Sequence, residues 1–170
     1  MRQKIQIIIV TILLCAVFIP TQASGQFFFF AENPNVGKEA PDLDLEKLDG
    51  SKIALSEFIK DSKAIIFFWA TWCPHCRVQL AQLDEMADEF SQQNIKVAII
   101  SIGEDPQQVA RFLNRLGIKS AVFLDVQDNA TQVFELIGVP TFVYVNSKGV
   151  IIEVEHELLE NYEDILNKES

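Results

Sequence analysis

Two cysteines three positions apart, Cys73 and Cys76, limit most strongly what this chain can fold into. They belong to the run Trp-Cys-Pro-His-Cys, residues 72–76, directly after an apolar segment of strand length, residues 64–69. Pro74 favours the first turn of a helix, because its φ angle is fixed and it has no N–H group to leave unbonded. Cys73 then lies at the helix N-terminus and Cys76 one turn later on the same face, with Cβ atoms about 5–6 Å apart. Small adjustments satisfy disulfide geometry, so the spacing predicts a redox pair.

The two cysteines have different expected roles. The unpaired N–H groups and the positive end of the helix dipole stabilise a thiolate at Cys73, which makes it the predicted nucleophile, and His75 adds positive character beside it. Cys76 lies further along the helix and is expected to be shielded, which suits a resolving thiol that attacks a mixed disulfide. Half of a zinc site or two inert structural cysteines are the alternatives. Zinc needs about four ligands, and outside the first 25 residues the only Cys and His residues are these two Cys, His75 and His156. A zinc site of Cys and His ligands would have to use all of them, which makes it less favoured than a redox pair.

The first 25 residues differ in composition from the rest of the chain. Two basic residues precede a largely apolar run, residues 5–19, and a proline and small residues follow it. This order is typical of a secretory signal peptide, and the run is shorter than the roughly 20 residues that span a bilayer. We predict a signal peptide or, alternatively, an N-terminal membrane anchor in residues 1–25, a leader in residues 26–35 and one folded domain in residues 36–168.

Export and charge limit the partners. An exported chain places its cysteine pair outside the reducing cytosol, where a disulfide is the resting expectation, so a membrane redox partner becomes part of the hypothesis. We expect the protein in the periplasm or at the outer face of the cytoplasmic membrane, as a monomer. The formal net charge of −10 makes nucleic acid an unfavourable partner.

The pattern after the leader predicts one α/β domain. Strand-like and helix-like segments alternate first and a hairpin follows, which is typical of a mixed sheet covered by helices. The expected elements are an N-terminal hairpin within residues 36–55, a short helix from residue 56, strands at 64–69, 95–102, 121–124, 141–145 and 150–154, and helices at 74–90, 106–116, 129–137 and 158–166.

Two motifs in this frame resemble the thioredoxin superfamily: residues 72–76 after a buried strand, and Gly-Val-Pro-Thr, residues 138–141, before the last hairpin. The entry at residues 37–42 and the helix–strand insert at about residues 104–125 are similar to the TlpA/ResA group of exported thiol-disulfide oxidoreductases. The resemblance covers about residues 36–168. It implies a thioredoxin fold, in which a mixed β-sheet is flanked by helices, with an N-terminal β-hairpin extension.

The resemblance also implies a site. The Val139–Pro140 bond is expected to be cis and to face the cysteine pair, which leaves the Val139 backbone free to pair with an extended substrate segment. Trp69 is expected in the core and Trp72 at the site. The predicted catalytic residues are Cys73 and Cys76, and the predicted site-tuning or substrate-binding residues are Trp72, Pro74, His75, Val139 and Pro140. Neither a metal nor a cofactor beyond the redox-active Cys73–Cys76 disulfide is predicted.

Two positions depart from the pattern of these families. Thioredoxins place a buried acid where this chain has Phe67, and TlpA/ResA-like proteins usually place a glutamate where it has Gln79. A buried acid near the resolving cysteine helps to deprotonate it. Its loss predicts slower release of the reduced product or a different preferred direction, although Gln79 is also explained as a polar residue on the helix surface.

We therefore predict an exported thiol-disulfide oxidoreductase that exchanges its CxxC pair with cysteine-containing exported proteins, as a TlpA/ResA-like disulfide reductase. A DsbA-like disulfide oxidase is the alternative, because Pro74-His75 and Val139-Pro140 match that protein, although the long helical domain inserted in DsbA is missing from this sequence.

Two further classes remain open. A peroxiredoxin-like peroxidase shares the Ala-Pro-Asp entry at residues 40–42 but has a Thr-x-x-Cys setting that is absent here. A copper- or heme-delivery binding module, which is not an enzyme, uses Cys73, Cys76 and His75 as soft ligands.

Overall fold

The computed structural model describes residues 33–168. The predicted signal peptide or anchor, residues 1–25, and most of the predicted leader, residues 26–35, lie outside the described residues. Within residues 33–168, no helix has both the length and the apolar character needed to cross a membrane.

One mixed sheet forms the centre of the described domain. Its strands, in chain order, are β1 (Asp44–Lys47), β2 (Lys52–Ala54), β3 (Lys63–Trp69), β4 (Ile95–Ile102), β5 (Val122–Asp125), β6 (Thr141–Val145) and β7 (Ile151–Glu155). They are arranged in the order β2-β1-β5-β4-β3-β6-β7. β3, β4 and β5 are parallel to one another, whereas the β2–β1, β1–β5, β3–β6 and β6–β7 pairs are antiparallel. The predicted mixed sheet is confirmed.

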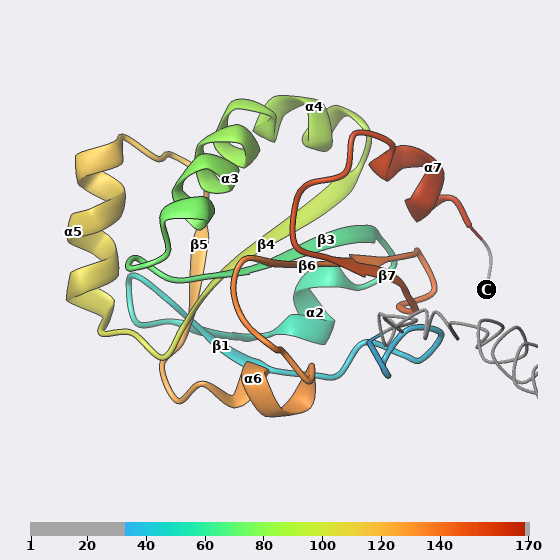
Figure 1. Ribbon diagram of the computed structural model, residues 1–170, viewed down its shortest axis with the longest axis horizontal. Helices are drawn as coiled ribbons and strands as arrows, with labels where there is room; N and C mark the ends of the chain where they lie inside the picture. Colours follow the sequence, from blue (N-terminus) through green and yellow to red (C-terminus); the bar gives the residue numbers. More distant parts are fainter. Residues whose placement is uncertain (1–32, 169–170) are drawn as a thin grey trace, which may run out of the picture. The chain divides into compact units, whose positions relative to one another are not determined.

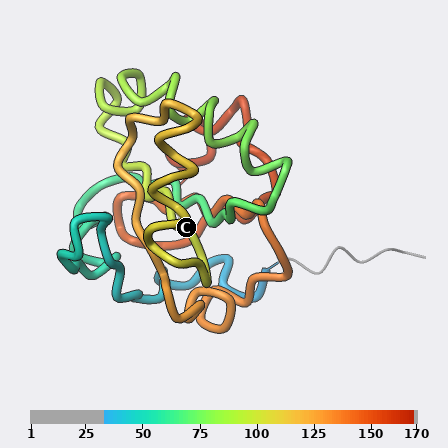
Figure 2. Tube along the Cα trace, turned by 90° about the vertical axis from the view of Figure 1, so that its left-hand side faces the viewer, coloured from blue at the N-terminus to red at the C-terminus, as the bar shows by residue number. Residues whose placement is uncertain are grey.

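Helices cover both faces of this sheet. They are α2 (Leu55–Ile59), α3 (Pro74–Glu85), α4 (Ala87–Gln92), α5 (Pro106–Leu116), α6 (Asn129–Val133) and α7 (Tyr162–Leu166). Figure 1 shows α3 and α4 on one side of the strands and α6 on the other. Figure 2, turned by 90°, shows the same separation, with the light-green α4 at the top and the orange α6 at the bottom.

The central strand β3 explains why there are two layers of core. Successive side chains of a strand point to opposite faces, and every residue of β3 after the first is buried. Phe67 and Trp69 pack into the cluster formed with α3, α4, α5 and α7, whereas Ile66 and Phe68 pack into the cluster formed with α2 and α6. Burial of each such side chain contributes about 1.5–3 kcal/mol, so the continuous apolar run fixes β3 between the two layers.

The N-terminal hairpin extension is confirmed. Gly50 has φ +81°, a left-handed conformation that favours glycine, and the Ser51 N–H donates to Asp49 Oδ1 at 2.9 Å within the turn. β1 then pairs with β5, with Glu46 opposite Leu124, so the hairpin extends the β5 side of the sheet.

Three predicted helix boundaries are wrong, each for a local reason. The helix expected over residues 74–90 divides at Met86, whose backbone leaves the helical region at ψ 2°. The helix expected to reach residue 137 ends at Val133, since Phe134 is buried against Phe68 and Glu135 takes φ +51°. The last helix begins at Tyr162 rather than near residue 158, because the N–H groups of residues 158 and 159 donate to side chains of α3 and β6.

Candidate redox site

Three connections meet at one edge of the sheet. Since β3 and β4 are parallel, the segments that follow them, residues 70–73 and 103–105, leave the sheet at the same edge. β6 runs antiparallel to β3 and pairs Thr141 with Phe68, so residues 138–140 reach the sheet there as well. The carboxyl edge of parallel strands is the usual position of a site in α/β sheets.

The cysteine pair lies in the first of these connections. Cys73 is the N-cap of α3 in extended conformation, Pro74 is the first helical residue, and Cys73 and Cys76 form a disulfide with Cα atoms 5.3 Å apart. The Cys76 N–H donates to Cys73 Sγ at 3.1 Å. Cys73 retains 3% exposure and Cys76 none, so Cys73 is the more accessible sulfur of the pair. The donated N–H and the helix N-terminus stabilise negative charge on Cys73 Sγ once the disulfide opens.

The segment before β6 faces this sulfur. The Val139–Pro140 bond is cis, as the resemblance implies, and the Val139 carbonyl oxygen lies 3.6 Å from Cys73 Sγ. His156, directly after β7, contacts this segment, with Nδ1 2.8 Å from the Pro140 carbonyl oxygen. A hydrogen bond at this distance to a carbonyl requires that Nδ1 carries the proton, because a carbonyl only accepts.

A groove runs beside the disulfide. It has a volume of about 470 Å³, and its walls come from α3, from the segment before β6 and from the end of β7. The lining residues are His75, Gln79, Ile137, Gly138, Val139, Pro140, Glu155, His156 and Glu157. His75, Val139 and Pro140 of the predicted site therefore share one surface.

The two tryptophans separate as expected. Trp69 is fully buried against Phe112, with ring centroids 5.6 Å apart, whereas Trp72 is 66% exposed next to Cys73. Ile137, at the groove, is 90% exposed. Large exposed apolar side chains beside a reactive sulfur are suited to contact another protein.

The two positions that lack an acid have distinct surroundings. Phe67 stacks on Phe142 at a centroid distance of 4.6 Å inside the core. Gln79 is not only a surface residue: its Oε1 accepts the Leu158 N–H at 3.0 Å, which ties α3 to the segment after β7.

A buried acid that the sequence did not reveal lies on the other side of the cysteine loop. Glu104 follows β4 and is only 7% exposed. Its carboxylate accepts from the Thr71 N–H at 2.8 Å, from Thr71 Oγ1 at 2.5 Å, from Ser101 Oγ at 2.8 Å and from Gln108 Nε2 at 2.9 Å. Glu104 therefore fixes the loop two residues before Cys73. Its sequence setting, Gly-Glu-Asp-Pro between a strand and a helix, is that of an ordinary solvated turn.

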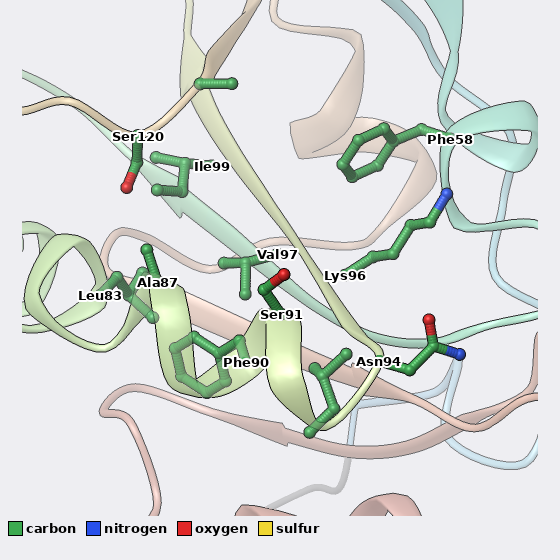
Figure 3. Close-up of a pocket in the computed structure, with 12 residues that line it drawn as sticks. Phe58, Leu83, Ala87, Phe90, Ser91, Asn94, Lys96, Val97, Ile99 and Ser120 are labelled. Carbon is green, nitrogen blue, oxygen red and sulfur yellow. The ribbon is translucent and has the colours of Figure 1, made fainter.

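A larger hollow belongs to another part of the domain. It has a volume of about 580 Å³ and is lined mainly by α4 and β4, as Figure 3 shows, with Phe90 and Ser91 on the helix and Val97 and Ile99 on the strand. Lys96 lies over the Phe58 ring, with Nζ 5.3 Å from the centroid. None of the predicted site residues lines it. Across residues 33–168, no three His, Cys, Asp or Glu side chains are grouped to hold a metal ion.

Two sequence comparisons identify relatives of this chain. A sequence model described as the AhpC/TSA family matches residues 36–154. The thiol-disulfide oxidoreductase ResA of Bacillus thuringiensis subsp. konkukian is 26% identical over 160 residues, which are 91% of this chain and 91% of the relative.

Solved structures from Chlorobium tepidum show the fold. A protein described as thiol:disulfide interchange protein DsbE superposes with a TM-score of 0.69 at 21% identity and covers 77% of this chain and 94% of its own. A thiol:disulfide interchange protein of the thioredoxin family gives a TM-score of 0.61 at 20% identity, and the match covers 75% of this chain and 92% of that protein. The expected thioredoxin-like fold and the resemblance to ResA proteins are confirmed.

Proposed function

Because this chain belongs to the AhpC/TSA family, we propose that its Cys73–Cys76 pair reduces disulfides of other exported proteins, as the ResA-like resemblance suggests. The chain is a protein thiol-disulfide oxidoreductase. One observation carries the proposal: Cys73 Sγ accepts the Cys76 N–H at the N-cap of α3, while Cys76 is fully buried behind it. This arrangement supports Cys73 as the attacking sulfur and Cys76 as the resolving one.

The chemistry follows from these two positions. In the reduced protein the Cys73 thiolate attacks one sulfur of the partner's disulfide, and the partner's other sulfur leaves as a thiolate. Cys76 then attacks Cys73 Sγ in the mixed disulfide, the partner's second thiolate leaves, and the Cys73–Cys76 disulfide forms. Two electrons pass to the partner in each cycle, so a donor must reduce the pair again.

We propose that the donor is a membrane redox partner and that the protein acts as a monomer in the periplasm or at the outer face of the cytoplasmic membrane. The apolar segment at residues 5–19 and the similarity to ResA support this proposal. The partners proposed are cysteine-containing exported proteins.

A DsbA-like oxidase is the second candidate, because Pro74-His75 separates the cysteines and His75 is exposed at the groove. The equilibrium redox potential of the pair, titrated against glutathione, decides the direction. A value at or below about −220 mV supports the reductase, whereas about −120 to −150 mV supports the oxidase and contradicts our proposal.

Two other classes have their own tests. A peroxidase would consume hydrogen peroxide with a thiol donor, which we do not expect, since Ala70 occupies the position three residues before Cys73 where that class has threonine. A copper-delivery module would hold copper through Cys73, Cys76 and His75 at physiological thiol concentrations. Rapid reduction of insulin disulfides without tight copper binding supports the oxidoreductase.

A further inference from the structure

Three arginines line one hollow beside the cysteine loop. Arg77 comes from α3, and Arg111 and Arg115 lie one turn apart on α5, which Figure 1 shows next to α3 on the same side of the sheet. The guanidinium carbons of Arg77 and Arg115 lie 5.4 and 5.6 Å from the centroid of the Phe112 ring. The three arginines, with Thr71, Gln108 and Phe112, line a hollow of about 360 Å³.

This hollow is linked directly to the cysteine loop. Arg77 follows Cys76 in the sequence, and its Nη2 donates to the Thr71 carbonyl at 3.3 Å. Thr71 lies two residues before Cys73 and lines the hollow. A group held by Arg77 therefore lies against the loop that carries the exchanging sulfur.

The positive charge in the hollow favours binding of an anion. Guanidinium groups stay protonated in proteins, so three positive side chains repel one another here. The Glu104 carboxylate behind Thr71 offsets part of this charge, but it already accepts hydrogen bonds from Thr71, Ser101 and Gln108. The chain as a whole carries −10, so this positive patch is a local exception.

We propose that the hollow binds a side-chain carboxylate of the protein whose disulfide is exchanged, close to the reacting cysteine. The planar guanidinium group matches a carboxylate in two parallel hydrogen bonds, and the Phe112 ring holds two of the three groups in place. The identity of the partner as a disulfide-bearing protein rests on the proposed function. Acidic residues beside the target cysteine are then part of what this chain recognises.

The first test is binding without redox chemistry. The probe is a peptide in which glutamates flank a serine that replaces the target cysteine. The control peptide has glutamines in place of the glutamates. Arg111→Glu is the variant, because it leaves the contacts of Arg77 and Arg115 with Phe112 in place. Lys148→Glu, at the exposed β6–β7 turn, makes the same charge change at a different hollow.

We expect Arg111→Glu to weaken binding of the glutamate peptide by about fivefold, and Lys148→Glu to leave it within about twofold. Added salt should weaken it as well, because exposed charges are screened. Equal affinity for the glutamine peptide, undetectable binding by the unmodified protein, or equal loss in both variants would overturn the proposal. So would Arg111-dependent binding to phosphatidylglycerol vesicles in place of the peptide, which would indicate a membrane contact.

The second test separates this inference from the proposed function. The glutamate and glutamine peptides are made as disulfides, and their reduction by the unmodified protein and by Arg111→Glu is followed. We expect the variant to slow only the glutamate peptide. Absence of reduction with intact glutamate binding would contradict the proposed function and leave the carboxylate site standing. Reduction that is equal for both peptides and both proteins would contradict the carboxylate site alone.

Discussion

Replacement of Glu104 by alanine should destabilise the protein by about 3 kcal/mol, since this carboxylate is the shared acceptor of four hydrogen bonds. Hydrogen bonds to charged groups contribute about 1.5–3 kcal/mol each, and a buried donor left without a partner costs about 1–3 kcal/mol. The hydroxyl groups of Thr71 and Ser101 can rotate about their C–O bonds, and Gln108 is exposed to water. The Thr71 N–H cannot turn away, so most of the loss comes from that donor.

The free energy of unfolding of the oxidised protein, measured in urea, tests this value. Glu104→Gln keeps one acceptor oxygen but turns an NH2 group toward the donors, so we expect a loss of about 1.5 kcal/mol for it. Glu160→Ala, at an exposed acid, is the matched control and should change stability by less than about 0.5 kcal/mol. A loss below about 1 kcal/mol for Glu104→Ala would refute the role of this carboxylate.

If Glu104 also positions the cysteine loop, the rate of exchange must change with it. Glu104→Gln, which is the milder substitution, should lower the rate at which Cys73 reacts with a small disulfide while far-UV circular dichroism stays unchanged. A rate equal to that of the unmodified protein would show that Glu104 stabilises the fold without positioning the sulfur.

Three further results are expected. Cys76→Ala should trap mixed disulfides with partner proteins on non-reducing gels, whereas Cys73→Ala should trap none; the reverse pattern would exchange their roles. Burial raises the pKa of the Asp84 carboxyl, but the hydrogen bonds that it accepts from residues 119 and 120 outweigh burial and lower the pKa below 3.8. The free energy of unfolding should therefore exceed that of Asp84→Asn by its full amount above about pH 4, and this difference should fade as pH falls. A constant difference across acid pH would contradict it. Burial and the hydrogen bond to Glu89 raise the pKa of Tyr162 from 10.0 to about 12, so the stability that this group contributes should be intact below about pH 10 and lost as pH rises through 12. Absorbance titration of tyrosinate in Tyr162→Phe and in the unmodified protein checks this assignment.

The parts of the fold that depend on local sequence could be predicted. A continuous apolar run of strand length favours a strand covered on both faces, and this pattern predicted β3 and β4. The Asp105–Pro106 start and Gly117 end of α5 are local signals whose caps the structure contains. The boundaries that failed depend on contacts between distant segments. The last helix starts late because Leu158 and Leu159 donate to Gln79 and to Tyr144, which lie on other elements.

The same division applies to the site. The spacing of Cys73 and Cys76 predicts the redox pair, and the family resemblance predicts the Val139–Pro140 segment. Glu104 is 31 positions after Cys73 in the sequence and becomes visible only once the parallel pairing of β3 and β4 brings both loops to one edge. No local pattern distinguishes an acid that will be buried there from one that stays in water.

The arrangement of acids bears on which step of the exchange is slow. At the two positions where related proteins use an acid near the resolving cysteine, this chain has an aromatic core residue, Phe67, and an amide, Gln79, that holds a backbone N–H. The buried carboxylate of Glu104 instead faces the segment before Cys73, where it holds Thr71. The carboxylate of Glu104 thus supports the loop of Cys73, the proposed attacking sulfur. Resolution of the mixed disulfide should therefore be the slow step, and Gln79→Glu should accelerate it without changing the first attack by Cys73. Rapid-mixing kinetics that show equal acceleration of both steps would contradict this assignment.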